Sequence, residues 1–447
     1  MASDLSRRLM RNPVRVVPLA FLAAIVIGTV LLTLPAAREG PYRADPLTAL
    51  FTATSAVCVT GLVVEDTPTY WSPFGQGVIM VLFQVGGFGI MTAATLLTVL
   101  VSRRLGLGDR LIAQVETKHG IGDVRGVVLR IGATVLVCEG ILTLILTGRL
   151  WTTYDHPFGE ALWHGSFQAV SAFNNAGFST YSDSLERFAT DWAINVPMMI
   201  AIIIGGIGFP VLFELLRRAG RPRTWSIHTR VTVLGSAALL AVGFVATLAL
   251  EWANPATLGP LGAADKALVS MFQSVTSRTT GFNTVPTGEL QPETWAVTDV
   301  LMFIGGGSAG TAGGIKVTTF FLLGFVIWSE IRGEREVVVG RRRVSSATVR
   351  QALTVVLLGA GLVVFGTISL LMLTDEPLDV VLFESVSAFA TVGLSTGITG
   401  DLPAAGQLIL VILMFVGRVG TITFASALAL RASRRRYRYP EERPIVG

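Results

Sequence analysis

One short stretch of the chain occurs four times on the same plan. Each copy opens with Phe, carries Ser or Thr near its middle and ends in Gly followed by an apolar residue. The copies occupy residues 51–62, 167–178, 272–282 and 383–394, and the third is one residue shorter between its Phe and its Gly. Internal repetition constrains the fold more than any local pattern, because each repeat is one structural unit that must pack against its neighbours.

The composition indicates a membrane protein. Apolar residues make up 51% of the chain and charged residues 15%, whereas soluble domains carry about 25% charged residues. Apolar runs at 14–34, 124–146, 231–250 and 353–373 reach the roughly 20 residues that a membrane span needs. The first run exceeds the roughly 7–15 residues of a signal-peptide core, so it is read as a retained span.

Charge is distributed unevenly along the chain. Arginines gather at 7–15, 103–110, 217–223, 332–350 and 431–438, and acidic residues flank the repeats. The positive-inside rule places the arginine clusters and both termini in the cytoplasm, with the repeats on the outer side. This interpretation is favoured over nucleic-acid binding. Two cysteines, Cys58 and Cys138, both in apolar segments, provide neither a disulfide framework nor a metal cluster.

Each quarter of the chain follows one order of elements. A span runs outward, a short helix re-enters, the Gly-containing stretch follows and a second span returns. The predicted units are 1–105, 106–220, 221–335 with a gating loop, and 336–447 with a cytoplasmic tail. Non-helical backbone at membrane depth persists only when it is buried in protein or lines an aqueous cavity. The predicted fold is therefore an all-α polytopic membrane protein with eight transmembrane helices, in which four pseudo-fourfold repeats surround one central pore.

The four repeat glycines predict a cation filter. A dehydrated cation needs oxygens that replace its water, and inward-facing backbone carbonyls supply them. Turning successive carbonyls to one side demands φ values that Gly adopts at low cost. One such Gly alone would be read as a packing or turn residue, but four in the same slot favour a filter. The predicted filter residues are Cys58, Val59, Thr60, Gly61, Asn174, Asn175, Ala176, Gly177, Thr279, Thr280, Gly281, Ala390, Thr391, Val392 and Gly393.

The returning spans carry a second repeated feature, at 84–90, 204–210, 304–316 and 416–421. Three of them read as ordinary Gly-containing helix interiors. The third is too rich in Gly for a stable helix, since each Gly costs roughly 1 kcal/mol relative to Ala. It predicts a broken span whose mobile loop acts as a gate beneath the pore. The predicted gate residues are Gly305, Gly306, Gly307, Ser308, Ala309, Gly310, Thr311, Ala312, Gly313, Gly314, Lys316 and Arg418.

Two alternatives to the gate fit the same residues. Close packing of small residues between helices would also use glycines. The pattern Gly305-x-Gly307-x-x-Gly310 fits a dinucleotide fingerprint, with Glu330 at a suitable distance, but it has no βαβ context.

Several charges lie within predicted spans. Arg418 lies mid-span, where a charge costs about 2.5–3.5 kcal/mol; it is predicted to bond carbonyls of the loop, with snorkelling as the alternative. Lys316 either anchors the loop or sits at the cytoplasmic face. Arg278 and Glu384 are predicted to pair with each other or with neighbouring acids. Glu139 has no assigned role and is not interpreted as an ion ligand.

The stretches 57–62, 173–178, 278–283 and 390–395 resemble the four filter loops of the Trk/Ktr/HKT superfamily of K⁺ transporters. The resemblance covers essentially the whole chain and is closest to the KtrB-type membrane subunits of bacterial Ktr systems. It implies K⁺ uptake across the bacterial plasma membrane by a homodimer with one pore per subunit. It also implies a cytoplasmic ring of KtrA-like nucleotide-binding subunits, and Na⁺ stimulation. No cofactor is expected in this chain, and the nucleotide would belong to the ring.

Other functions make different demands on the sequence. A Trk-type or Na⁺-permeable relative would differ in coupling, and Gly61 favours K⁺ because Na⁺-permeable members of the family tend to have Ser there. A membrane-embedded enzyme predicts paired carboxylates, a Ser/His set or a metal cluster, which the spans lack at usable spacing. A scaffold without transport would not need four glycines in one slot. The arginine-rich segments 106–125, 217–230 and 332–350 are too short for a domain and are the predicted docking surface for the ring.

Overall fold

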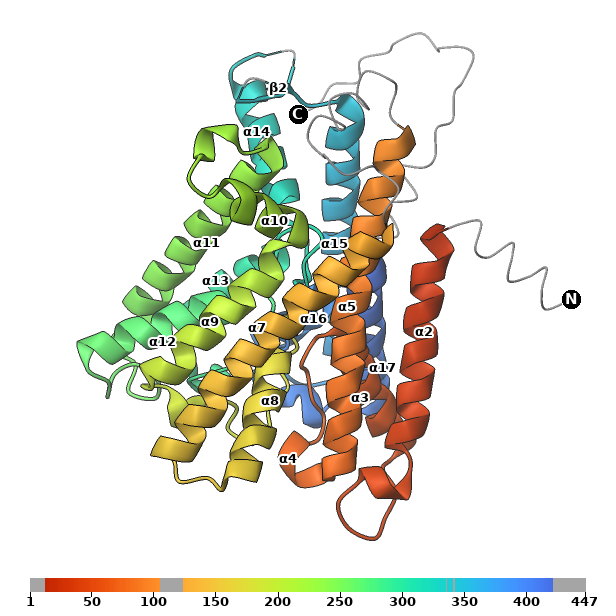
Figure 1. The fold of residues 1–447 in the computed structure, drawn as a ribbon, viewed down its shortest axis with the longest axis vertical. Coiled ribbons are helices and arrows are strands. Elements are labelled where there is room, and N and C mark those ends of the chain that lie inside the picture. Colours follow the sequence, from red (N-terminus) through yellow and green to blue (C-terminus); the bar gives the residue numbers. More distant parts are fainter. Residues whose placement is uncertain (1–12, 105–123, 335, 341, 421–447) are drawn as a thin grey trace, which may run out of the picture.

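The computed structural model describes residues 13–104, 124–334, 336–340 and 342–420. These residues form a bundle of long and short helices with one antiparallel hairpin of β1 (Val338–Val339) and β2 (Arg342–Arg343) (Figure 1). The predicted arginine cluster at 431–438 and most of the predicted docking segment at 106–125 lie outside the described residues.

The helices follow one another in an alternation of long and short elements. In the first half they are α2 (Pro13–Leu32), α3 (Pro46–Cys58), α4 (Thr67–Tyr70), α5 (Pro73–Arg104), α7 (Val124–Thr153), α8 (Phe158–Asn174), α9 (Trp192–Ile207) and α10 (Phe209–Arg218). In the second half they are α11 (Ile227–Glu251), α12 (Ala263–Thr276), α13 (Pro292–Ile304), α14 (Val317–Ile331), α15 (Ser346–Leu371), α16 (Leu378–Ala390) and α17 (Ala404–Phe415). Short 3₁₀ turns lie at Pro35–Ala37, Glu186–Phe188, Pro222–Thr224, Thr287–Glu289 and Ile398–Gly400.

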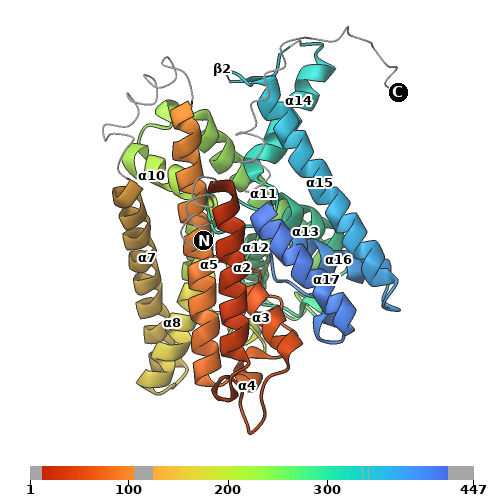
Figure 2. The ribbon, with the colours of Figure 1, turned by 90° about the vertical axis from the view of Figure 1, so that its right-hand side faces the viewer.

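Apolar helices of membrane-spanning length are present. Among the described residues, four helices qualify by length and composition: Pro73–Thr95, Gly126–Thr153, Ile227–Glu251 and Ser346–Leu371. The bent pair α9 and α10 makes a fifth if it counts as one span. Large apolar side chains are exposed on these helices, as an environment of lipid requires, and the predicted total of eight spans stays a prediction. Figure 2 shows α7 and α15 on opposite sides of the bundle, with α2 and α5 between them.

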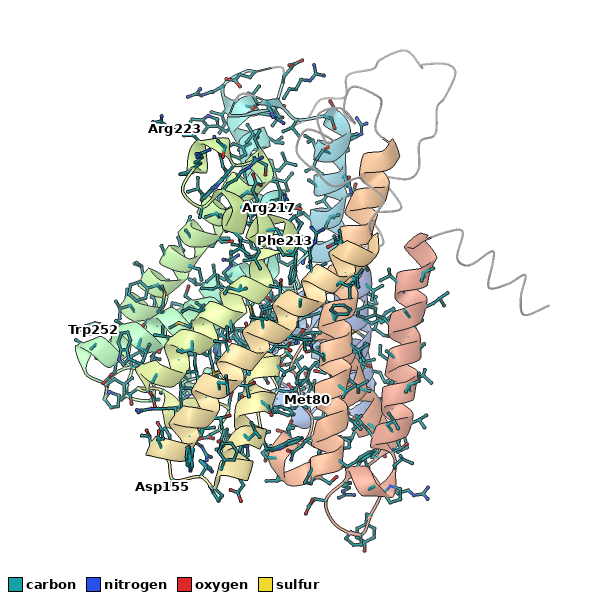
Figure 3. All side chains as sticks on the ribbon, viewed as in Figure 1. Met80, Asp155, Phe213, Arg217, Arg223 and Trp252 are labelled. Atoms are coloured by element: carbon teal, nitrogen blue, oxygen red, sulfur yellow. The ribbon has the colours of Figure 1, made fainter. Side chains whose placement is uncertain are left out.

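The two ends of the bundle differ in their residues. Figure 3 shows Arg223 at one end with Arg217 nearby, and Asp155 at the other end. Both arginines are exposed. The arginine-rich end is also the end that carries the hairpin.

The short helices α3, α8, α12 and α16 carry the four repeat copies and lie in the protein core. Each follows a long helix and packs against it: α3 on α2, α8 on α7, α12 on α11 and α16 on α15. The Phe that opens each copy is fully buried, namely Phe51, Phe167, Phe272 and Phe383. Between helices in lipid, association depends on close packing rather than on removal from water. The repeated buried Phe therefore gives each short helix a packing contact inside the bundle.

The returning spans depart from the sequence expectation in two places. The predicted break in the third is present, since α13 ends at Ile304 and α14 begins at Val317. The second is also broken: α9 and α10 meet at Gly208 with a bend of 108°, so the expectation of an ordinary helix there is wrong. Gly208 has φ +96°, and Pro210 lies in the first turn of α10, which its fixed φ suits.

The fourth returning span is likewise not an ordinary helix. After α17 the chain forms a π-helical turn at Val416–Gly420. Such turns widen the helix locally and often occur at functional sites. Of the three spans expected to be regular, the first, at 84–90 within α5, is continuous.

Candidate functional site: a ring of four loops

The four repeat glycines lie against one another in a closed ring. A Cβ added to Gly61 would lie 2.5 Å from the carbonyl oxygen of Ala176 and 3.1 Å from Cα of Gly177. At each of the other three glycines an added Cβ would likewise lie against the backbone of the next loop. The successive contacts are Gly61 to Gly177, Gly177 to Gly281, Gly281 to Gly393, and Gly393 back to Gly61. No side chain fits at any of the four positions, so the ring is bounded by backbone there.

The backbone of each loop alternates in handedness. All four glycines have positive φ, between +72° and +95°, and so does the residue two positions earlier. These earlier residues are Val59 (56°), Asn175 (60°), Thr279 (105°) and Thr391 (51°), and the residue between is not at positive φ. Positive φ values at alternate residues turn successive carbonyls to the same side of the chain, which Gly allows at low cost.

The positive φ values before the glycines were not foreseen from the sequence. A non-Gly residue in this region is strained by roughly 1–2 kcal/mol, and for the β-branched Val59 and Thr391 it is a clear outlier. Such strain persists only where the surroundings enforce it, and it concentrates at functional sites. No sequence signal marks these positions beyond their place two residues before the Gly.

The Ser or Thr near the middle of each copy holds its loop. In the first and fourth copies its hydroxyl accepts a hydrogen bond from the glycine N–H. In the second and third it donates to the carbonyl of the residue after the Gly. The pairs are Ser55–Gly61 (3.1 Å), Ser387–Gly393 (3.1 Å), Ser171–Phe178 (2.8 Å) and Thr276–Phe282 (2.6 Å). The hydroxyl at this position therefore has a shared structural role in all four copies.

Glycines of the returning spans let those spans touch the ends of the short helices. Three of these glycines leave no space for a side chain. A Cβ added to any of them would overlap a carbonyl oxygen, which in each case belongs to the residue four positions before a ring glycine. The pairs are Gly86 with Val57, Gly205 with Phe173 and Gly417 with Phe389. The sequence pattern located these glycines, but their common partner became visible only in the structure.

A cavity of about 180 Å³ opens on one side of the ring, and its lining includes all four glycines. Asp66 lies in this lining and accepts a hydrogen bond from Ser182 at 2.7 Å, which links the first and second quarters. Nearby, burial and then the Asp183 carboxylate raise the pKa of Glu186, although a hydrogen bond from Asn283 opposes them. Carboxylates around a cavity raise the local concentration of cations.

The segment 305–316 lies on the other side of the ring. The cavity is lined by residues that follow the ring glycines, whereas this segment contacts residues that precede them. A Cβ on Gly313 would overlap the carbonyl of Ala390 and the hydroxyl of Thr391. The Thr311 hydroxyl donates to Asn175 Oδ1 at 3.1 Å. The segment therefore closes against the ring from below the cavity.

Thr311 connects this segment to three other parts of the molecule. Its N–H donates to the Gly205 carbonyl (3.1 Å), its hydroxyl to Asn175, and its carbonyl accepts from Arg418 (2.5 Å). The predicted hydrogen bond of Arg418 to the loop is thus present, and the side chain is only 2% exposed, which contradicts snorkelling. The Arg418 bond joins residues 107 positions apart in sequence.

Two further cations bond this segment. Lys316 Nζ donates to the carbonyls of Ala312 (2.7 Å) and Gly313 (3.0 Å), which matches the anchoring alternative. Arg278 donates to the Gly305 carbonyl through Nε (3.2 Å) and Nη2 (2.8 Å). Each guanidinium or ammonium thus satisfies carbonyls that the broken helix leaves unpaired.

The expected pairing of Arg278 with Glu384 is wrong. Glu384 instead accepts hydrogen bonds from the Thr396 N–H (3.0 Å), the Thr399 hydroxyl (3.0 Å) and the Ser395 hydroxyl. Arg278 bonds the loop, and its Nη1 also donates to the Ser236 carbonyl at 3.2 Å. Arg278 and Glu384 thus each find hydrogen-bond partners within their own quarter, which avoids the cost of an unpaired charge.

Apolar helices that enclose a ring of backbone loops define a membrane transport protein rather than an enzyme. Within the described part of the chain, no group of three or more His, Cys, Asp or Glu side chains could hold a metal ion.

Comparison with known families agrees with this class. Residues 3–435 match the family model TrkH, described as cation transport protein. The chain belongs to this family of cation transporters.

Individual relatives match over nearly their whole length. The "Ktr system potassium uptake protein B" of Bacillus subtilis (strain 168) is 39% identical over 437 residues, covering 98% of this chain and 97% of the relative. The "Potassium/sodium uptake protein NtpJ" of Enterococcus hirae is 32% identical over 98% of this chain and 97% of its own. The crystal structure of the potassium transporter TrkH from Vibrio parahaemolyticus matches with a TM-score of 0.69 at 19% identity, covering 93% of this chain and 85% of that one. This likeness shows the fold.

Proposed function

We propose that this chain is the membrane subunit of a K⁺ uptake system of the bacterial plasma membrane, with the ring of four loops as its selectivity filter. The closed ring of glycines with alternating φ carries this proposal. A backbone path without side chains, in which successive carbonyls face one way, suits a dehydrated monovalent cation. The name of the Bacillus subtilis relative, a potassium uptake protein, supports K⁺ as the ion.

The segment 305–316 is the gate in this proposal. It contacts the ring on the side opposite the cavity, where an ion leaving the ring would pass. Arg418, Lys316 and Arg278 bond four of its carbonyls. Its backbone also bonds α9, through Gly307 N–H to the Gly206 carbonyl at 2.9 Å. A segment held by such replaceable bonds can move without unfolding a helix.

The proposed topology places the 180 Å³ cavity outside the cell and the arginine-rich end in the cytoplasm. Eight spans in four repeats, with the unit boundaries given above, and cytoplasmic termini belong to this proposal. A ring of KtrA-like nucleotide-binding subunits docks at the arginine-rich end, and the regulatory nucleotide belongs to that ring. The membrane subunit forms a homodimer with one pore per subunit, and Na⁺ stimulates uptake.

The second candidate is a Trk-type or Na⁺-permeable transporter with different coupling. The printed name of the Enterococcus hirae relative, which includes both potassium and sodium, supports it. The Na⁺-permeable candidate differs from the first in the ratio of K⁺ to Na⁺ flux, and the Trk-type candidate differs in its coupling. Gly61 in the ring favours K⁺, because a side chain there would overlap the second loop.

Complementation tests the proposal. A strain that lacks its own K⁺ uptake systems is expected to grow at low K⁺ when it makes this chain with its partner subunit. The same chain with Gly281→Asp is the control and is expected to fail. Growth no better than the empty vector, with the partner present, contradicts the proposal. K⁺ and Na⁺ flux in proteoliposomes, with and without the partner, then decides between the two candidates.

A further inference from the structure

A carboxylate without a role in the path described so far lies in the middle of α7. Glu139 is 5% exposed, and it lies within the apolar span Gly126–Thr153. A charge at that depth is expensive unless hydrogen bonds satisfy it, and in membrane spans it usually marks a functional site. The sequence showed the anomaly but not the partner, which comes from other helices.

The partners of Glu139 form a closed polar cluster behind the second loop. Asn174 Nδ2 donates to Glu139 Oε1 (2.9 Å), to Gln84 Oε1 (2.5 Å) and to the Val170 carbonyl (2.9 Å). Gln84 Nε2 donates to Glu139 Oε2 (3.2 Å). Both carboxylate oxygens accept from amide nitrogens. The two N–H groups of Asn174 are shared among three acceptor oxygens, which fixes the orientation of its amide.

The helix α5 is shaped to admit this cluster. A Cβ on Gly87 would overlap Oδ1 and Cγ of Asn174. The amide consequently lies directly against α5, one turn from Gln84 on the same helix. Gly87 and Gln84 of α5 therefore both contribute to the contact with Asn174.

Asn174 is where the second loop begins. It is the last residue of α8, and Asn175 after it adopts the left-handed conformation. Asn175 donates from Nδ2 to the Thr279 hydroxyl of the third loop (3.2 Å) and accepts from Thr311 of the segment below (3.1 Å). The position of Asn174 thereby sets the start of one loop and its links to two neighbours.

The corresponding position, three residues before the ring glycine, differs between quarters. It holds Cys58, Asn174, Arg278 and Ala390. The second and third quarters are therefore tied to surrounding elements by a polar side chain here, and the first and fourth by apolar packing. In the second quarter alone this tie ends on a buried carboxylate among the described residues.

We propose that Glu139 and Gln84 form a brace that positions Asn174, and so sets how well the ring discriminates K⁺ from Na⁺. Both are positioning residues, because neither borders the ring. The inference rests on the proposed function, since it assigns a specificity determinant to the same filter.

An exchange of the two brace residues tests this role. In Glu139→Gln an N–H₂ group must face another N–H₂, and in Gln84→Glu two carboxylates meet. The double variant, which carries both substitutions, swaps the amide and the carboxylate between α5 and α7. The amide, now on α7, then donates to the carboxylate, now on α5. Asn174 still donates to both side chains.

The readout is the K⁺/Na⁺ flux ratio of full-length chains in proteoliposomes. Each single variant is expected to lower this ratio by about tenfold, the effect of losing one charged hydrogen bond. The double variant is expected to return the ratio to within about twofold of the unchanged chain, because its hydrogen bonds are complete again.

Glu251→Gln is the matched control. Glu251 is fully buried and accepts hydrogen bonds from Asn254, Thr257, Gln291 and Thr294, none of which is a ring residue. This variant is expected to lower thermal stability while leaving the flux ratio unchanged. If Glu139→Gln does not fold, Gln84→Glu and the double variant make the same comparison.

The outcomes separate the two proposals. A flux ratio in the single variants equal to that of Glu251→Gln, or a double variant that restores nothing, overturns the brace while K⁺ flux in the unchanged chain upholds the filter. Absence of K⁺ flux in the unchanged chain overturns the proposed function, and the brace with it.

Discussion

The third and fourth loops hold equivalent places in the ring but are supported in different ways. In the fourth, Glu384 follows the opening Phe383 and bonds the segment after the ring glycine through Ser395, Thr396 and Thr399. In the third, Gln273 occupies the same position. It is 1% exposed, and neither of its polar side-chain atoms has a partner among the described residues. The fourth loop is therefore braced from behind, and the third is not.

The third loop is held from below instead. Its helix α12 ends at Thr276 with right-handed Ser277 as its cap, whereas α16 ends on the left-handed Thr391. Arg278 then bonds the Gly305 carbonyl at the start of the segment 305–316. One quarter of the ring is therefore built to stay fixed, while another is joined through Arg278 to the proposed gate.

The largest expected effect comes from filling the ring at the third loop. In Gly281→Ala the new Cβ would lie 2.5 Å from the Val392 carbonyl and 2.9 Å from Cα of Gly393, so the ring must open. K⁺ flux is expected to fall by about a hundredfold or more, as when a preorganised polar site loses its geometry. Gly397→Ala is the control. Gly397 also has positive φ but has nothing within 4 Å of an added Cβ, so flux through this variant should stay near that of the unchanged chain.

Freeing the gate gives the next largest effect. Arg418→Ala removes the bond to the Thr311 carbonyl and is expected to raise K⁺ flux about tenfold in the absence of the partner ring, the scale of one charged hydrogen bond. Arg278→Gln is expected to act in the same direction, because it releases Gly305. Flux through Arg217→Ala, which changes an exposed arginine, provides the baseline. No rise in either gate variant would contradict the assignment of 305–316 as the gate.

Thermal unfolding of the purified chain sharpens the comparison of the two braces. Glu384→Gln loses charged hydrogen bonds and is expected to destabilise the protein by about 1.5–3 kcal/mol. Gln273→Met replaces an unpartnered buried amide with an apolar side chain of similar length. It is expected to be neutral or stabilising, because an unsatisfied buried amide costs about 1–3 kcal/mol. Equal destabilisation by the two substitutions would show that the third loop is braced as firmly as the fourth.

The smallest expected effect is that of Thr311→Val. The substitution keeps the shape and the backbone bonds of Thr311 but removes the hydroxyl that donates to Asn175. One neutral hydrogen bond contributes about 0.5–1.5 kcal/mol, so K⁺ flux is expected to rise a few-fold. An effect as large as that of Arg418→Ala would mean that the ring, rather than the fourth quarter, holds the gate closed.

The sequence predicted the parts of the site that depend on glycine. Four copies of one stretch located the ring, and the density of Gly in 305–316 located the break, because backbone freedom is a property of the residue itself. The second break at Gly208 was missed, since a single Gly before Phe209-Pro210 resembles an ordinary helix interior.

Partners of buried charges were harder to predict. Arg418 was assigned to the loop correctly because it lies in the matching position of another repeat. Arg278 was predicted to pair with Glu384 or with neighbouring acids, and its partner was missed because the Gly305 carbonyl belongs to the backbone and carries no signature in sequence. Glu139 had no assignment, because Gln84 and Asn174 lie 55 and 35 positions away. The left-handed Val59 and Thr391 escaped notice for the same reason: tertiary contacts, and not residue type, impose that conformation.

The central claim is that the ring of four loops binds a dehydrated K⁺. Its most direct test is a structure of the full-length chain determined in Rb⁺ or Tl⁺, whose anomalous scattering locates the ion. An anomalous-density peak is expected on the axis bounded by Gly61, Gly177, Gly281 and Gly393. This peak is expected to disappear in Gly281→Ala. Anomalous density confined to the cavity beside the ring, with none between the four glycines, would contradict it.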